Sequence, residues 1–382
     1  MRNIIKYASL LLAAAMLFAC EGVETNDTLK LTSDKNLLQL GEEATLTVTL
    51  GTKVITEGVV FYDSKDKVLN LPDFKFKATE VGKYEIWANY GSYNSETFTI
   101  TVSDLKMPET PADPKPESIN FKVRALITEF TTTGCSYCPQ MKQLLHSALE
   151  KKDVEDKVVL TACHSMLINS VPDPAYIRTD YQTFANIGGF PYLFCDMYEP
   201  EGRYTMSTSE MVSIINGFCE EKKDIASGIA VATDMKDGQI VAKVTIKAAK
   251  SATYRVGAFL LEDGIYGNQS NASADWMHIH DNVIRYIDAG TQTFYGHLVG
   301  EIEAGKTADY AFGWLLDEIW KTGRINGERY GGYSWDDPVV ENLHMAVFVC
   351  AIDTNEKGEQ FYRVVNVVDC PINAKVPFEY AE

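Results

Sequence analysis

Two cysteines three positions apart form the clearest chemical pattern in this sequence. Cys135 and Cys138 enclose the dipeptide Ser136–Tyr137 and follow an apolar run at 123–130 that predicts a buried strand. A helix is predicted after them by apolar residues at spacings of three and four: Met141, Leu144, Leu145, Ala148 and Leu149. A thiolate at a helix N-terminus faces unpaired N–H groups and the positive end of the helix dipole, which lowers its pKa from about 8.5 to about 3.5–7.5. We therefore expect Cys135 to be the exposed attacking thiol and Cys138 to resolve the mixed disulfide.

Two other roles for this pair stay open at the level of sequence. A structural zinc site needs four ligands, usually from two paired motifs, and Cys163–His164 is a poor second pair for the single C-x-x-C. No metal and no cofactor are therefore expected. The pair could also be an inert structural disulfide, as is common in exported proteins.

Two further features resemble thioredoxin-like proteins. Glu129 lies six residues before Cys135, where these proteins, notably the protein disulfide isomerases, have a buried acid. The resemblance implies that Glu129 exchanges a proton with Cys138. The GGFPY segment at 188–192 resembles their cis-proline loop. It implies that a client chain docks at Phe190 and Pro191, beside the C-x-x-C dipeptide.

The same residues have plainer interpretations. Strand alternation could turn Glu129 outward as an exposed carboxylate, and Pro191 could be an ordinary trans proline in a turn. The sequence also departs from thioredoxin, because Gly134 stands where a tryptophan commonly precedes the first cysteine. Residues 164–174 are expected to be an inserted loop that could shape a substrate groove.

The N-terminus predicts export and lipid anchoring. Arg2 and Lys6 precede an apolar run at 7–19, which suits a signal peptide and is too short to span a membrane. The run ends in LFAC at 17–20, which resembles a lipoprotein signal box, so Cys20 is the expected lipidation site. An ordinary signal peptide with an incidental cysteine is the alternative. No later stretch is apolar enough to cross a bilayer, so contact with the membrane is expected through the lipid alone.

The chain is acidic, with a formal net charge of -18 over 382 residues. An acidic surface repels phosphate backbones, so nucleic acid is not an expected partner. The length exceeds that of one hydrophobic core and predicts two or three domains.

Composition and periodicity divide the chain into six segments and predict a multidomain α+β protein. Alternating apolar runs between Gly and Asp/Asn turns predict a small Ig-like β-sandwich at 27–104 and a larger β-sandwich at 225–382. Alternating strand and helix patterns predict an α/β domain, which the resemblance above makes thioredoxin-like. One of its helices is expected at 175–186. The segments are a signal peptide at 1–19, a tether at 20–26, the first sandwich at 27–104, a Pro-rich linker at 105–120, the thioredoxin-like domain at 121–224 and the second sandwich at 225–382.

Five cysteines remain beyond Cys20 and the C-x-x-C pair, and we expect them to be mainly small buried apolar residues. Cys350 and Cys370 are predicted on one hairpin, with Cys350 opposite a residue near 363 and therefore not bonded to Cys370. A polar cluster in the last domain is formed by His278, His280, Asp281 and Arg285. Two histidines on one strand face would suit a metal, and a hydrogen-bonded structural network is the alternative.

The whole arrangement resembles the outer-membrane-protein-28-related lipoprotein family. The resemblance rests on TGCSYCP at 133–139, GFP at 189–191 and HDNVIR at 280–285, and it covers most of residues 121–382. It implies an outer-membrane lipoprotein that faces the periplasm or the cell surface. We expect a thiol–disulfide oxidoreductase or isomerase acting on exported protein thiols with a further redox partner. The alternatives are a surface adhesion or binding protein that uses the domain as a scaffold, and an assembly partner that recruits clients through the last sandwich.

Overall fold

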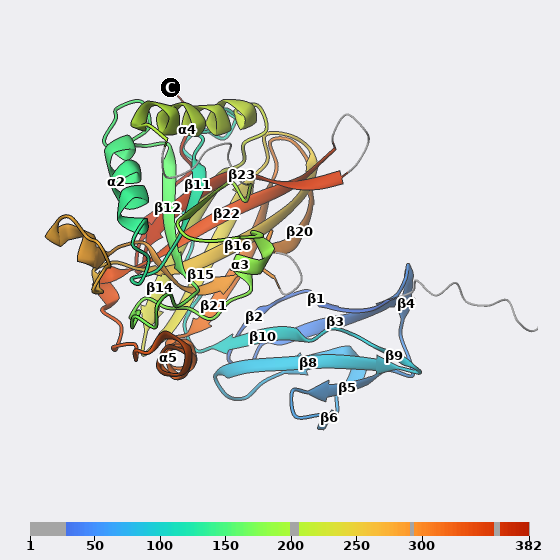
Figure 1. The fold of residues 1–382 in the computed structure, drawn as a ribbon. Helices are drawn as coiled ribbons and strands as arrows, with labels where there is room; N and C mark the ends of the chain where they lie inside the picture. The colour runs from blue at the N-terminus through green and yellow to red at the C-terminus, as the bar shows by residue number, and fades with distance from the viewer. Residues whose placement is uncertain (1–27, 199–205, 291–293, 355–359, 382) are drawn as a thin grey trace, which may run out of the picture. The chain divides into compact units, whose positions relative to one another are not determined.

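The protein is described by a computed structural model that covers residues 28–198, 206–290, 294–354 and 360–381 (Figure 1). The predicted signal peptide, Cys20 and the tether lie outside these residues. Strands make up 43% of the structure and helices 17%, so the protein is mostly β with several sheets. The chain forms two compact units, Met1–Val102 and Ser103–Glu382. No helix in the described ranges is long and apolar enough to cross a membrane.

The first unit is built from two antiparallel sheets. One contains β1 (Leu29–Ser33), β3 (Glu43–Leu50), β4 (Lys53–Ile55) and β7 (Lys75–Lys77). The other contains β2 (Leu37–Gln39), β10 (Phe98–Ser103), β8 (Gly82–Tyr90), β5 (Val60–Asp63), β6 (Val68–Leu69) and β9 (Tyr93–Asn94), and the 3-10 helix η1 (Pro72–Phe74) precedes β7.

Alternation along these strands builds the core of the first unit. Leu46 and Val48 of β3 pack with Ile86 of β8 and Ile100 of β10, so both sheets contribute to one apolar interior. The hydroxyl of Tyr84 donates a hydrogen bond to the Glu80 carbonyl oxygen at 3.0 Å. This bond ties the start of β8 to the preceding turn.

The second unit begins with alternating strands and helices. They are β11 (Ala125–Thr131), α2 (Cys138–Leu149), β12 (Val158–His164), α3 (Tyr181–Phe184), β13 (Tyr192–Cys195) and α4 (Thr208–Lys222). The strands β11 and β12 run parallel, and β13 pairs antiparallel with β11. Parallel strands need a crossover connection, and α2 provides it.

The remainder of the second unit is mainly β. It contains β14 (Gly228–Lys236), β15 (Gln239–Lys247), β16 (Ala252–Glu262), β17 (Ile265–Tyr266), η2 (Asp275–His278), β18 (Ile279–His280), β19 (Val283–Asp288) and β20 (His297–Ile302). It continues with β21 (Thr307–Leu315), α5 (Leu316–Asn326), the π-helix η3 (Gly327–Gly331), η4 (Val340–Asn342), β22 (Leu343–Thr354), β23 (Gln360–Pro371) and β24 (Lys375–Val376).

One sheet crosses the boundary that the sequence predicts at 224/225. Its order is β13-β11-β12-β19-β16-β22-β23, with β20 paired to β16. Ala162 of β12 pairs with Val283 of β19 in a parallel ladder. A second sheet, β21-β15-β14-β24, packs on the larger one through an apolar cluster that includes Val244 and Val347. The residues at 121–224 and 225–382 therefore share one sheet and one compact unit.

The strand β11 has different neighbours on its two faces. Ile127 packs with Met141 and Leu145 of α2, whereas Leu126 and Phe130 belong to a cluster on the opposite face. Figure 1 shows α2 and α4 on one side of β11 and β12. Since side chains alternate along a strand, residues an even number of positions from Ile127 face α2.

The Pro-rich segment at 105–120 lies along the second unit. Lys247 of β15 is buried, and its Nζ donates to Asp113 Oδ2 at 2.8 Å and to the Pro116 carbonyl oxygen at 2.6 Å. The hydroxyls of Thr110 and Thr245 are also hydrogen-bonded to each other, with 2.9 Å between their oxygens. The predicted linker is therefore attached to β15 at several of its residues.

The helix expected at 175–186 is much shorter, since α3 covers only Tyr181–Phe184. Tyr176 instead forms an isolated parallel bridge with His164, and Ile177 N donates to the His164 carbonyl oxygen at 2.7 Å. Backbone groups that complete the end of β12 are not available for a helix, and apolar periodicity alone does not reveal this competition.

Candidate redox site

The two cysteines form a disulfide at the start of α2. Their Cα atoms are 5.5 Å apart, and Cys138 is the first residue of the helix. The backbone N–H of Cys138 donates to Cys135 Sγ at 3.1 Å. A helical N–H that has no acceptor within the helix therefore donates to the first sulfur, as expected for a helix N-terminus that stabilises a thiolate.

The expectation that Cys135 is exposed is wrong for this oxidised state. Cys135 is 3% exposed and Cys138 1%, while Ser136 is exposed and Tyr137 is 57% exposed. The dipeptide between the cysteines therefore forms the surface of the site. The sulfur of the expected nucleophile lies just beneath it.

The loop at 165–174 packs against the residues just before Cys135 and explains Gly134. A Cβ atom added at Gly134 would lie 2.2 Å from the Ile168 carbonyl oxygen and 3.2 Å from the Val171 Cβ. The Thr133 hydroxyl donates to the Pro172 carbonyl oxygen at 2.9 Å. Glycine is required here by the close approach of this loop, which occupies space that a tryptophan side chain would need.

The loop from Thr133 to Ser136, which we call the redox loop, is held on its other side by a segment beyond residue 225. Gln269 Nε2 donates to the Cys135 carbonyl oxygen at 2.9 Å, and Ser270 N donates to the Thr133 carbonyl oxygen at 2.7 Å. Asn271 Nδ2 donates to the Ser136 carbonyl oxygen at 3.0 Å. These residues could not be predicted from the sequence because they form no motif and lie more than 130 positions from their partners.

Glu129 faces α2 and not the solvent. It lies two residues after Ile127 and is 6% exposed. Burial raises the pKa of its carboxyl to about 7, although the charges of Lys142 and His164 lower it. Its Oε1 has no hydrogen-bond partner within the described part of the chain. Such a carboxyl can hold and release a proton near neutral pH.

Geometry places this carboxyl beside the start of α2. Two residues of β11 span about 6.6 Å, and one turn of α2 spans about 5.4 Å. Ile127 packs against Met141, so Glu129 lies level with the turn that begins at Cys138. Lys142, on the next turn, donates from Nζ to the Met277 carbonyl oxygen at 3.3 Å and to that of Ile279. Burial lowers the pKa of Lys142.

A buried His–Asp–His group lies next to Glu129. His164 Nδ1 is 2.9 Å from Asp173 Oδ2, and the rings of His164 and His280 meet edge to face at 4.8 Å. Burial would raise the pKa of Asp173, but His164 lowers it to about 2, while burial and the His164 charge lower the pKa of His280 well below its usual value. Asp173 Oδ2 also accepts from Thr133 N at 3.2 Å. Asp173 therefore connects the loop at 165–174, which we call the covering loop, both to His164 and to the redox loop.

The predicted cluster around His280 does not gather at one point. His278 ends the 3-10 helix η2, so strand alternation does not apply to it, and its Nδ1 accepts from Gln269 N at 3.1 Å. Asp281 accepts from Gly264 N at 2.9 Å, and Arg285 pairs with Glu262 at 3.0 Å. Within the described residues no group of three or more His, Cys, Asp or Glu side chains is arranged to hold a metal ion.

The Phe190–Pro191 peptide bond is cis. It immediately precedes β13, whose Tyr192 pairs with Phe130 near the end of β11. The redox loop begins after that same end of β11. The cis-proline segment and the redox loop therefore lie at the same end of the strands β11 and β13. Both Phe190 and Pro191 are partly exposed.

The other described cysteines are buried thiols. Cys350 pairs with Val364 across the β22–β23 hairpin, which confirms the register expected from the sequence. Burial raises the pKa of Cys163 to about 12 and that of Cys370 to about 11, so neither is a thiolate near neutral pH.

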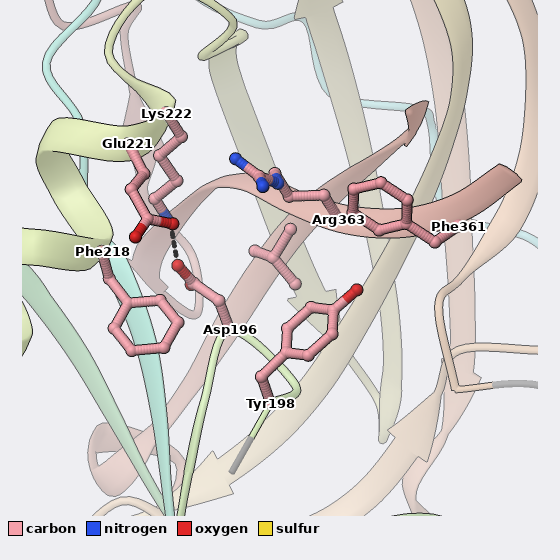
Figure 2. A pocket seen from close by; sticks show the side chains of 8 residues that line it. Asp196, Tyr198, Phe218, Glu221, Lys222, Phe361 and Arg363 are labelled. Atoms are coloured by element: carbon pink, nitrogen blue, oxygen red, sulfur yellow. Dashed lines mark hydrogen bonds and ion pairs between the residues drawn. The ribbon is translucent and has the colours of Figure 1, made fainter. Parts of the chain in front are cut away.

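A separate cavity of about 450 Å³ lies near the other end of β11 (Figure 2). Its walls include Tyr198, Phe218 and Phe361. The buried Lys222 Nζ is 2.6 Å from Asp196 Oδ2, and Asp196 Oδ1 accepts from Leu126 N at 2.9 Å. Leu126 is near the start of β11, so this cavity is distinct from the redox loop that follows its end.

The comparisons with known proteins include two distant structural similarities. No protein-family model matches the chain, and no curated protein matches it. Among solved structures, HBP35 of Porphyromonas gingivalis is similar with a TM-score of 0.49 and 18% identity over 68% of this chain and 78% of that one. E. coli alpha-2-macroglobulin in its native conformation has a TM-score of 0.18 and 9% identity over 91% of this chain and 27% of that one. Neither similarity bears on function.

Proposed function

We propose that this protein is a cell-envelope thiol–disulfide oxidoreductase or isomerase that acts on exported protein thiols through Cys135 and Cys138. The observation that carries the proposal is the buried Glu129 carboxyl, whose pKa is raised to about 7 on the face of β11 that packs against α2. An inert disulfide has no need of a proton-exchanging group beside it. A buried cysteine that becomes a leaving group does need one.

The proposal includes a thioredoxin-like module at 121–224 and an Ig-like module at 27–104. The first is supported by the parallel β11–α2–β12 unit, the antiparallel β13 and the cis bond before Pro191. The second is supported by its two-sheet core and the Tyr84 hydrogen bond. Membership of the outer-membrane-protein-28-related lipoprotein family, with lipid on Cys20 and a location at the outer membrane, belongs to the same proposal and rests on the sequence motifs.

The exchange proceeds in two displacements. A client thiolate attacks Cys135 Sγ and forms a mixed disulfide, and the electron pair of the broken Cys135–Cys138 bond goes to Cys138 Sγ. Glu129 gives its proton to that sulfur. A second client thiolate then attacks the client sulfur of the mixed disulfide, and Cys135 leaves as a thiolate near the α2 N-terminus. The client is oxidised by two electrons and the cysteine pair is reduced; the reverse sequence reduces a client disulfide. The client backbone is proposed to dock at Phe190 and Pro191, next to Ser136 and Tyr137.

Trapping tests this function. In a Cys138→Ala variant the mixed disulfide at Cys135 has no resolving thiol, so incubation with oxidised glutathione should give a stable adduct of one glutathione per protein, measured by mass spectrometry. The Cys135→Ala/Cys138→Ala variant is the control for labelling of other thiols. A Cys138→Ala protein that forms no adduct at Cys135 after reduction would contradict the proposal.

The low exposure of Cys135 favours a second candidate, a surface binding protein that uses this fold as a scaffold. Gln269 and Ser270 hold the redox loop in place, as would suit a permanent disulfide. In that case the pair should stay oxidised in glutathione buffers, with a reduction potential below about -300 mV. A higher potential would support the oxidoreductase.

A further inference from the structure

Large apolar side chains are exposed around the redox dipeptide. Tyr137 is 57% exposed, Tyr266 65%, Trp276 37% and Ile279 36%. We call these four residues the aromatic rim. Three of them come from the β17–η2–β18 segment, outside the residues that resemble thioredoxin.

Contacts with α2 place this segment along the helix that begins at Cys138. The Trp276 ring centroid is 4.9 Å from that of His146, and Lys142 Nζ is 5.5 Å from the Trp276 ring. Lys142 also donates to the Ile279 carbonyl oxygen. In Figure 1 the segment, coloured orange, projects next to α2. Trp276 therefore lies along α2 at Lys142 and His146, in the second and last turns of the helix, and Ile279 lies near Lys142.

The remaining contacts join the rim to the redox loop itself. Tyr266 pairs directly with Ile279 in the β17–β18 ladder, so their side chains point to the same face. At the next residue, a Cβ on Gly267 would lie 2.8 Å from Thr133 Cγ2. Asn271 Nδ2 donates a hydrogen bond to the Ser136 carbonyl oxygen. The segment thus borders the loop from Thr133 to Ser136.

We propose that the aromatic rim binds apolar or aromatic side chains flanking the cysteine of an extended, unfolded exported polypeptide. This inference rests on the thiol–disulfide exchange proposed above. Neighbouring exposed apolar residues mark interaction sites on soluble proteins. Because Cys135 is only 3% exposed, a partner's sulfur can reach Cys135 Sγ only if it is carried on a narrow, flexible segment of chain. A folded protein surface does not fit that requirement, whereas an unfolded chain also offers the apolar side chains that the rim can cover.

Competing peptides test the proposal with the reduced full-length protein. Two ten-residue peptides each carry one cysteine as its mixed disulfide with glutathione. One has Phe and Leu two positions on either side of the cysteine, and the other has Ser at both positions. Rates of disulfide transfer to the protein are measured by mass spectrometry, with oxidised glutathione as the small substrate for normalisation. The wild-type protein should react about tenfold faster with the apolar peptide, as expected when part of one large side chain is buried.

Substitutions on the rim should remove that preference. In Tyr266→Ser/Trp276→Ser the ratio of the two peptide rates should fall to near one. Leu298→Ser on β20 is the matched control, since Leu298 is 60% exposed in the same unit, and its ratio should stay at the wild-type value. If the double variant is unfolded by circular dichroism, Tyr266→Ser alone, at the most exposed rim position, should lower the ratio.

The outcomes separate this inference from the proposed function. Equal rates for the two peptides in the wild-type protein, with normal exchange with oxidised glutathione, would overturn the rim and leave the oxidoreductase intact. A preference that survives the rim substitutions would also overturn it. Failure of exchange with both peptides and with glutathione would remove the proposed function itself.

Discussion

Glu129 shows how the neighbours of one residue set its chemistry. Strand alternation turns its side chain toward α2, where water is excluded and burial raises the pKa of the carboxyl to about 7. Lys142 and His164 oppose that shift, and without them the carboxyl would remain protonated to higher pH. A carboxyl with this pKa can act as both acid and base near neutral pH.

Replacement of this carboxyl should change the pH dependence of exchange. Once Cys135 carries a glutathione, Cys138 must lose its proton to resolve the adduct, and the Glu129 carboxylate is the expected acceptor. In the wild-type protein the resolution rate, followed by quenched-flow mass spectrometry, should rise through about pH 7 and then level off. In Glu129→Gln the rate at pH 7 should fall about 10²-fold and the step near pH 7 should vanish. Glu150→Gln, on the exposed end of α2, serves as the control, and a step that persists in Glu129→Gln would contradict the assignment.

Glu129→Gln should also change how the stability of the protein depends on pH, and this effect can be measured without an activity assay. The pKa of Glu129 rises from 4.5 to about 7 on folding, so the unfolded chain loses the proton first as the pH increases. The stability of the wild-type protein relative to Glu129→Gln should therefore be greatest below pH 4.5, fall between pH 4.5 and about 7, and level off above. Urea unfolding at several pH values measures this difference. A difference independent of pH would mean that the carboxyl is not protonated on folding.

At the scale of elements, the covering loop at 165–174 packs closely against the redox loop at Gly134. A Cβ there would meet the Ile168 carbonyl oxygen, which is backbone and cannot move without the loop. Gly134→Ala should therefore destabilise the protein by about 1–3 kcal/mol and increase the rate at which Cys135 reacts with a maleimide after reduction. Gly217→Ala in α4 is a matched control, because a Cβ there meets nothing within 4 Å, and it should stabilise by up to about 1 kcal/mol. Unchanged stability and labelling in Gly134→Ala would show that the loop does not cover the sulfur.

Sequence patterns predicted those elements that depend on local order. The apolar run before Cys135 became β11, and the spacing of Met141, Leu144 and Leu145 became the buried face of α2. The features that patterns missed depend on distant partners. Gln269 reaches the Cys135 carbonyl across 134 positions, and Tyr176 is drawn into pairing with His164. The exposure of Cys135 could not be predicted for the same reason, because it is set by those distant segments.

At the scale of the whole molecule, aromatic contacts connect residues that the sequence assigned to separate domains. Ring centroids are 5.3 Å apart for Phe130 and Tyr181, 5.6 Å for Tyr181 and Phe259, and 5.1 Å for Phe259 and Phe348. Strand patterns describe each half correctly as sheet-forming. They do not reveal that β12 and β19 join the halves into one sheet.

Unfolding should therefore occur in two steps and not three. Calorimetry of the full-length protein should show one transition for Met1–Val102 and one for Ser103–Glu382, because each is a compact unit. Phe130→Ala and Phe348→Ala should each lower the midpoint of the same transition, at a cost of about 3–5 kcal/mol, although one residue lies before 224 and the other after it. Val48→Ala, buried in the first unit, should lower only the other transition. If Phe130→Ala moves a transition that Phe348→Ala leaves in place, residues 121–224 fold as a domain of their own and the shared sheet does not couple them to the rest.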